Sequence, residues 1–237
     1  MITCIFGIRG MGKTRLARRL LAEHPRMLAY DPYGEHEALR FDQPEALVAY
    51  LDQHAKRGRF RCSLASWRAA NIQTESDYFC ATAWATAQVT GDCLAVFEEV
   101  DMIAPPGRET PQFRRLIAQG RHAGGRGHTG VSILSTSRRP AEVSRLLTSQ
   151  ADHIYAFRLQ EPADLQYFRS VIGREPSDAI PTLSPGEYVA WTSTEWSVCR
   201  LPDQLGKPPI PRDNNPRADP PQDDDEDDTG DGAQDPA

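Results

Sequence analysis

Apolar runs of strand length alternate along this chain with longer amphipathic stretches. Strand-like runs cover residues 2–6, 26–30, 59–64, 93–98, 130–136 and 153–158, and helical periodicity covers 13–23, 43–57, 75–89, 110–121, 140–150 and 161–173. Crossovers long enough to hold a helix favour parallel strands that are covered on both faces. The alternation therefore predicts an α/β fold with a mainly parallel sheet flanked by helices. Residues 186–201 predict a C-terminal hairpin, expected at an antiparallel edge.

Charge is distributed unevenly between the body of the chain and its C-terminal end. The whole chain has a formal charge of −6, from 27 basic and 33 acidic residues. Residues 202–237 hold 11 acids and 3 bases (−8), which leaves 22 acids and 24 bases (+2) in residues 1–201. The same segment holds eight of the 19 prolines and the acidic run 223–228. We therefore expect one folded domain at 1–201 and a Pro-rich, acidic, disordered tail at 202–237.

Several classes of protein are excluded by composition. No apolar run approaches the roughly 18 residues that a membrane-spanning helix requires, so a transmembrane segment is not expected. The N-terminal ten residues are too short and too soon glycine-rich for a secretory signal. The five cysteines lack CxxC spacing, which indicates reduced thiols in a cytoplasmic protein rather than disulfides.

A glycine-rich turn follows the first apolar run. Residues 7–14, GIRGMGKT, satisfy the P-loop pattern GxxxxGK[ST] and lead into an amphipathic stretch. In such a loop backbone N–H groups converge on phosphates, and the N-terminal end of the helix dipole adds positive potential. Lys13 would then reach the β- and γ-phosphates of ATP, and the Thr14 hydroxyl would ligate Mg²⁺. The predicted nucleotide-binding residues are Gly7, Gly10, Met11, Gly12, Lys13, Thr14 and Arg15.

Two carboxylates end the fourth apolar run, in the form of a Walker B element (residues 94–99, LAVFEE). Glu98 would hold Mg²⁺, and Glu99 would orient or deprotonate the attacking water. Because aspartate is the usual residue on the metal side, the longer Glu98 leaves Glu99 or Asp101 as alternative functional acids. Adjacent residues of a strand point to opposite faces, so only one carboxylate can reach a given point unless the chain bends.

Three further segments resemble the FtsK–HerA superfamily of P-loop ATPases, which have a RecA/ASCE-like sheet. Residues 30–35 (YDPYGE) are similar to the turn after the second strand of HerA-type ATPases. Residues 116–124 (LIAQGRHAG) resemble the helix and loop beyond Walker B, and residues 133–143 (ILSTSRRPAEV) resemble the sensor strand. The family usually has glutamine after the sensor threonine. Here Ser137 is expected to take the sensor's place, with Arg138 or Arg139 near the phosphates.

Arginines are concentrated between residues 108 and 145, a segment that contains eight arginines and only two acidic residues. A guanidinium suits either a phosphoryl transition state or a DNA phosphate. The resemblance implies that one arginine acts on the nucleotide of a neighbouring subunit. Arg121 is the leading candidate, with Arg126, Arg138 and Arg139 as alternatives. The glycine-rich residues 124–128 predict either a pore loop that contacts DNA or an ordinary solvated loop.

The chain resembles, within this superfamily, the small genome-packaging ATPases of tailless, membrane-containing double-stranded DNA viruses, because its P-loop strand begins at residue 2. This resemblance implies ATP and Mg²⁺ as cofactors and a homo-oligomeric ring, expected to be a hexamer. It also implies non-sequence-specific binding of double-stranded DNA and a docking partner at a capsid vertex or in the virion membrane. The protein would act in the host cytoplasm or at the packaging vertex. A filamentous-phage-type assembly ATPase, a small P-loop nucleotide kinase and a non-catalytic ATP switch remain alternatives.

Overall fold

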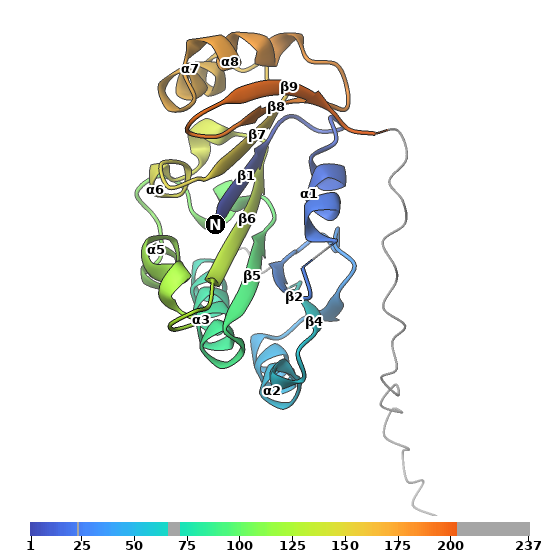
Figure 1. Ribbon diagram of the computed structural model, residues 1–237, viewed down its shortest axis with the longest axis vertical. Helices are drawn as coiled ribbons and strands as arrows, with labels where there is room; N and C mark the ends of the chain where they lie inside the picture. Colours follow the sequence, from blue (N-terminus) through green and yellow to red (C-terminus); the bar gives the residue numbers. More distant parts are fainter. Residues whose placement is uncertain (23, 66–71, 203–237) are drawn as a thin grey trace, which may run out of the picture. The chain divides into compact units, whose positions relative to one another are not determined.

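A mainly parallel sheet forms the centre of the computed structural model, which describes residues 1–22, 24–65 and 72–202 (Figure 1). Within these residues the strand order is β3-β4-β2-β5-β6-β1-β7-β8-β9. The strands are β1 (Ile2–Phe6), β2 (Arg26–Tyr30), β3 (Leu39–Phe41), β4 (Phe60–Leu64), β5 (Asp92–Phe97), β6 (Gly130–Ser137), β7 (His153–Phe157), β8 (Glu187–Trp191) and β9 (Trp196–Arg200). Among the strand pairs of the described residues, only β7–β8 and β8–β9 are antiparallel. The predicted α/β class and the C-terminal hairpin at the sheet edge are confirmed.

Helices cover both faces of the sheet and divide its core in two. They are α1 (Lys13–Leu21), α2 (Pro44–His54), α3 (Ile72–Thr90), α4 (Val100–Ile103), α5 (Pro111–Gln119), α6 (Arg145–Thr148), α7 (Pro162–Val171) and α8 (Arg174–Ala179). Helix α1 packs on one face, where Leu16 and Leu21 join Ile5 of β1 in one apolar cluster. The other face holds the larger cluster, with side chains from α2, α3, α5 and α7. Burial on both faces explains why the strands read as continuous apolar runs.

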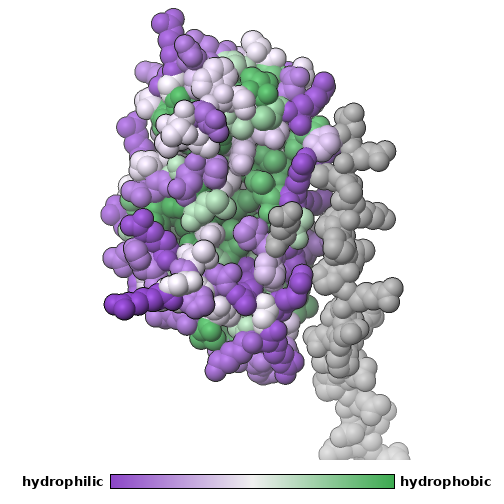
Figure 2. All heavy atoms as spheres, viewed as in Figure 1, coloured by the Kyte–Doolittle hydropathy of each residue, from purple (hydrophilic) through white to green (hydrophobic). Residues whose placement is uncertain are grey.

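The surface and the cysteines agree with this layered interior. Figure 2 shows hydrophilic residues over most of the visible face, with hydrophobic ones gathered along its middle, where Figure 1 shows strands.

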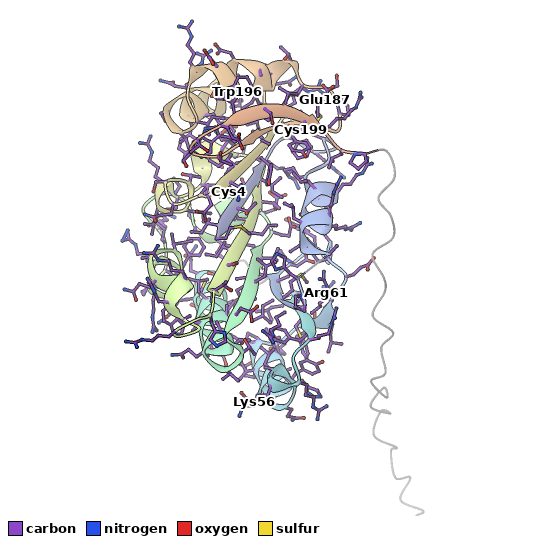
Figure 3. The ribbon with its side chains drawn as sticks, viewed as in Figure 1. Cys4, Lys56, Arg61, Glu187, Trp196 and Cys199 are labelled. Carbon is purple, nitrogen blue, oxygen red and sulfur yellow. The ribbon has the colours of Figure 1, made fainter. Side chains whose placement is uncertain are left out.

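All five cysteines are free thiols, and four of them are buried. Cys4 lies on the central strand β1 (Figure 3), where burial raises the pKa of its thiol to about 12. None of the described helices combines the length and apolar character needed to cross a bilayer.

The helix predicted at 140–150 is wrong. Residues Pro140–Glu142 form a single 3₁₀ turn, Val143 is extended (φ −97°, ψ 142°), and α6 begins only at Arg145. The Ser144 hydroxyl accepts a hydrogen bond from the Leu146 amide (3.2 Å), which caps the new helix. Buried Val143 and this cap favour an interrupted chain over a continuous helix.

Other boundaries differ by a few residues. Strand β5 ends at Phe97, so Glu98 lies beyond the strand in which the sequence placed it. Strand β3 and helices α4 and α8 were not predicted, since three to six residues carry too little periodicity. The disorder predicted for the tail falls on residues that, apart from Pro202, lie outside the described part of the chain.

A chain of edge-to-face aromatic contacts links the strands to the helices of the larger core. The Phe79 ring of α3 lies 5.7 Å from Tyr30 of β2 and 5.4 Å from Phe97 of β5, between ring centroids. Phe97 in turn lies 5.5 Å from Phe113 of α5. Phe79 therefore joins α3 to two strands, and Phe97 extends the chain of contacts to α5.

Replacing Phe79 with alanine should lower the free energy of unfolding by about 3–5 kcal/mol, because the fully buried ring leaves a cavity and loses two aromatic contacts. Urea denaturation followed by circular dichroism measures the change. The neighbouring Tyr78, with 42% of its surface exposed, is the control, and Tyr78→Ala should cost less than about 0.5 kcal/mol. Equal losses for the two variants would contradict the role assigned to this aromatic chain.

Candidate functional site

The glycine-rich loop connects β1 to α1 at the carboxyl-terminal edge of the sheet. Its start is held between two strands, because the Gly7 amide donates to the Ser137 carbonyl (3.2 Å) and the Ile8 amide to the Arg158 carbonyl (3.1 Å). Gly7 has φ 149°, and a Cβ there would lie 2.6 Å from the Cβ of Phe157. Gly12 has φ 114° and immediately precedes α1. Only glycine suits these positions, and the N-terminal amides of α1 face the same loop.

Lys13 and Thr14 begin α1 beside this loop. The Lys13 Nζ donates to the Gly7 carbonyl (2.7 Å), which keeps the ammonium against the loop. Burial lowers the pKa of Lys13, and the nearby carboxylate of Glu99 opposes that shift. The Thr14 hydroxyl donates to a carboxylate oxygen of Glu35. Backbone amides, an ammonium and oxygen donors suit a nucleotide phosphate with Mg²⁺, so the residues present fit both predicted ligands.

Two of the other predicted residues, Met11 and Arg15, have contacts within the chain. Met11 is buried, and its carbonyl accepts a hydrogen bond from the Gly186 amide (3.0 Å). The Arg15 guanidinium donates to the Pro202 carbonyl. Among the described residues, leaving out the two neighbours in the chain, no atom lies within 4 Å of a Cβ built on Gly10. Lys13 and Thr14 are therefore the predicted residues whose side chains contact the loop carbonyl of Gly7 and the neighbouring carboxylate of Glu35.

Glu98 lies directly after β5 and is almost completely buried, with 5% of its side chain exposed. One carboxylate oxygen lies 2.5 Å from Nε2 of His36, and the other accepts a hydrogen bond from the Thr136 hydroxyl. The Glu98 amide donates to the Tyr30 carbonyl (3.1 Å). Because β5 lies between β2 and β6, Glu98 joins the carboxyl-terminal ends of three neighbouring strands.

The chain bends at Glu99, the one described residue other than glycine with a positive φ (φ 49°, ψ 55°). The bend removes the strand alternation that would send Glu98 and Glu99 to opposite faces. Glu99 accepts a hydrogen bond from Nε of Arg138 (2.8 Å), and its amide donates to Thr136 Oγ1 (3.3 Å). Burial raises the pKa of Glu99, and the Arg138 charge works against that rise. Such a conformation in a charged residue is typical of a functional position.

The sensor segment divides its side chains between two places. Arg138 pairs with Glu99, whereas Arg139 pairs with Asp164 (3.2 Å) and Glu142 (3.0 Å), away from that carboxylate. Ser137 ends β6, and its hydroxyl accepts a hydrogen bond from the Arg139 amide (3.0 Å). Arg138 is therefore the sensor-segment arginine that lies in the site. A cleft of about 330 Å³ lies beside it, lined by Ile8, Arg9, Arg138, Arg139, Leu159, Gln160, Glu161 and Asp164.

Arg121 lies at the opposite edge of the sheet, in a 3₁₀ turn at Gly120–His122 that precedes β6. Strand β6 runs from this edge to the P-loop edge over eight residues, or about 25 Å. Arg121 and the 124–128 loop therefore lie far from the P-loop of their own chain. A Cβ on Gly124 would lie 1.9 Å from the Gly91 carbonyl oxygen, so close backbone packing explains that glycine without DNA.

Three site residues were missed from the sequence: Glu35, His36 and Thr136. Asp31 organises the first two, because its buried carboxylate accepts the amides of Glu35 (3.0 Å) and His36 (2.9 Å). An Asp-Pro turn at the end of a strand was the available signal, since the carboxyl ends of parallel strands share one edge. Among the described residues no three His, Cys, Asp or Glu side chains form a metal-binding cluster.

Comparisons with known proteins find solved structures that have a similar fold. No family model matches the sequence, and no curated protein matches it. The genome-packaging NTPase B204 of Sulfolobus turreted icosahedral virus 2, in complex with AMPPCP, has a TM-score of 0.70 at 16% identity over 86% of this chain and 98% of its own. VirB4 of Thermoanaerobacter pseudethanolicus has a TM-score of 0.62 at 10% identity over 86% and 90%. At these identities the likeness shows the fold, which is that of the P-loop ATPases.

Proposed function

We propose that this chain is a Mg²⁺-dependent ATPase that moves double-stranded DNA as a ring, in the manner of a viral genome-packaging motor. The observation that carries the proposal is the placement of Glu99. Its carboxylate lies at a bend just after β5, paired with Arg138 and within electrostatic range of Lys13. The fold shared with the viral packaging NTPase B204 supports the DNA-moving part.

The described side chains divide the work of ATP hydrolysis among them. Lys13 and the loop amides would bind the phosphates, and Thr14 and Glu98 would hold Mg²⁺, which supplies charge neutralisation when bound. Glu99 would orient the attacking water and accept its proton, since burial raises its pKa and makes it a better base. Arg138 would keep Glu99 in place through the 2.8 Å contact.

The arrangement of arginines supports a ring. A subunit whose Arg121 lies about 25 Å from its own P-loop can use that arginine only on a neighbour's nucleotide. A hexamer is the expected closure of such a head-to-tail contact. Arg126 on the neighbouring loop would contact DNA phosphates without reading sequence. A capsid-vertex or virion membrane protein would then dock the ring in the host cytoplasm.

The test is ATP turnover with and without long duplex DNA, at several salt concentrations, together with the mass of the assembly in solution. DNA of unrelated sequences should stimulate turnover equally, and the stimulation should weaken steeply as salt rises. A protein that stays monomeric with ATP and DNA, and whose turnover ignores DNA, would contradict the proposal. Transfer of phosphate to a small-molecule acceptor would favour the nucleotide kinase instead.

Mixing of two inactive variants should restore turnover if Arg121 acts between subunits. Arg121→Ala keeps its own Glu99, and Glu99→Gln keeps Arg121, so mixed rings contain some interfaces with both groups intact. We expect each variant alone to be at least about 100-fold less active than wild type, and the mixture to recover measurable activity. Arg174→Ala, which alters an exposed arginine of α8, is the control and should behave as wild type. Full activity of Arg121→Ala on its own would transfer the role to one of the alternatives, Arg126, Arg138 or Arg139.

A further inference from the structure

The turn at residues 31–36 contacts both of the groups that would hold the metal. Asp31 fixes the turn through two backbone amides, and the Arg18 guanidinium of α1 donates twice to the Glu35 carbonyl (2.9 and 2.6 Å). From this fixed backbone Glu35 accepts the Thr14 hydroxyl, and His36 reaches Glu98. Two consecutive side chains of one turn thus contact the two metal-side residues.

The buried side chain of His36 contacts Glu98 through one of its ring nitrogens. The His36 side chain is 1% exposed, and Nε2 faces a carboxylate oxygen of Glu98 at 2.5 Å, the geometry of a hydrogen bond to that carboxylate. The other ring nitrogen, Nδ1, finds no hydrogen-bond partner among the described residues. A buried polar atom without a partner costs stability. An apolar side chain would serve packing better, so packing alone does not account for a histidine here.

We propose that His36 is a positioning residue that fixes the Glu98 carboxylate for the metal, and that Glu35 orients the Thr14 hydroxyl in the same way. A glutamate has one more side-chain torsion than the aspartate usual on the metal side, so its carboxylate has more positions to choose from. His36 on one oxygen and Thr136 on the other select one of these positions. The longer acid and its two donors therefore form one unit.

This inference rests on the proposed function, because it assumes a nucleotide with a divalent metal at the P-loop. Outer partners that orient metal ligands typically contribute 10- to 100-fold to metal affinity. His36 and Glu35 contact the metal-side groups and not the loop amides, so their loss should weaken the metal while sparing the phosphates. The test therefore compares the affinity for the metal with the affinity for the nucleotide in the same variants.

The experiment measures Mn²⁺ binding by electron paramagnetic resonance in the presence of a non-hydrolysable ATP analogue, using the full chain. His36→Leu, which removes the donor at similar size, should weaken Mn²⁺ about 10- to 100-fold. Binding of a fluorescent ATP analogue, measured in EDTA so that no metal is bound, should stay within about twofold of the wild-type affinity. His36→Gln keeps an N–H donor at the reach of Nε2 and should restore most of the Mn²⁺ affinity. Glu35→Ala, at a half-buried position, gives a second variant that should fold and should also weaken Mn²⁺.

The matched control is His54→Leu, the same change at a half-buried histidine of α2 that bonds the Tyr50 carbonyl (2.9 Å) far from the P-loop in sequence. It should leave Mn²⁺ affinity unchanged. Wild-type Mn²⁺ affinity in both His36→Leu and Glu35→Ala would overturn the inference, as would an equal loss of metal-free nucleotide binding. A wild-type protein that binds no nucleotide at all would instead contradict the proposed function.

Discussion

Glu99→Gln is expected to lower ATP turnover at least about 100-fold while ATP binding stays close to wild type. Glutamine keeps the size of the side chain and can still accept a hydrogen bond from Arg138, but it cannot take a proton from water. General-base groups typically contribute 10²- to 10⁴-fold to rate. Steady-state turnover and binding of a fluorescent ATP analogue separate the two effects.

Glu142→Gln provides the matched control, since Glu142 is exposed and pairs with Arg139 rather than with a group of the site. Its turnover should equal that of wild type. Retained activity in Glu99→Gln, with loss in Glu98→Gln or Asp101→Asn, would move the catalytic role to one of those acids. Little turnover in the wild type itself would favour the non-catalytic ATP switch.

Lys13→Met is expected to weaken ATP binding and turnover by at least about 100-fold without lowering the melting temperature. The Lys13 ammonium lies against the loop through the Gly7 carbonyl, and a charge-assisted contact with phosphate is among the strongest available to a side chain. Burial lowers the pKa of Lys13, which means that folding disfavours its charged form. An apolar side chain of similar length removes that cost, so stability should stay the same or rise.

Lys56→Met is the control, because Lys56 is the other lysine of the described chain and lies exposed after α2 (Figure 3). Thermal denaturation and nucleotide titration of both variants complete the test. A large drop in melting temperature for Lys13→Met alone would mean that Lys13 supports the loop through the Gly7 carbonyl more than it binds phosphate.

The sequence predicted best what is contiguous in the chain. The P-loop needs a strand, a glycine turn and a helix in immediate succession, so residues 2–21 were read correctly together. The parallel sheet followed from the alternation of runs, because both faces are buried. The helix at 140–150 failed, since Val143 takes an extended conformation that no helical pattern reveals.

The site itself was less predictable, because its members come from separate strands. The alternation of side chains along a strand predicted that Glu98 and Glu99 would point to opposite faces unless the chain bent. The structure shows that the chain does bend, through a left-handed conformation at Glu99. Thr136 and His36 meet Glu98 only because β2, β5 and β6 end side by side, and their order in the sheet is not their order in the sequence. The distance from Arg121 to the P-loop likewise required the direction of β6.

Strand β6 connects the nucleotide end of the sheet to the Arg121 end in the proposed motor. One of its ends carries Thr136 against the two glutamates, and the other follows the Arg121 turn directly. A paired strand inside a sheet cannot shorten, and packed interiors are barely compressible. In the proposed motor, displacement at the nucleotide end would therefore be transmitted to the Arg121 end as movement of the whole subunit. The step along DNA should accordingly be sought in rotation between subunits, with each sheet keeping its shape throughout the cycle.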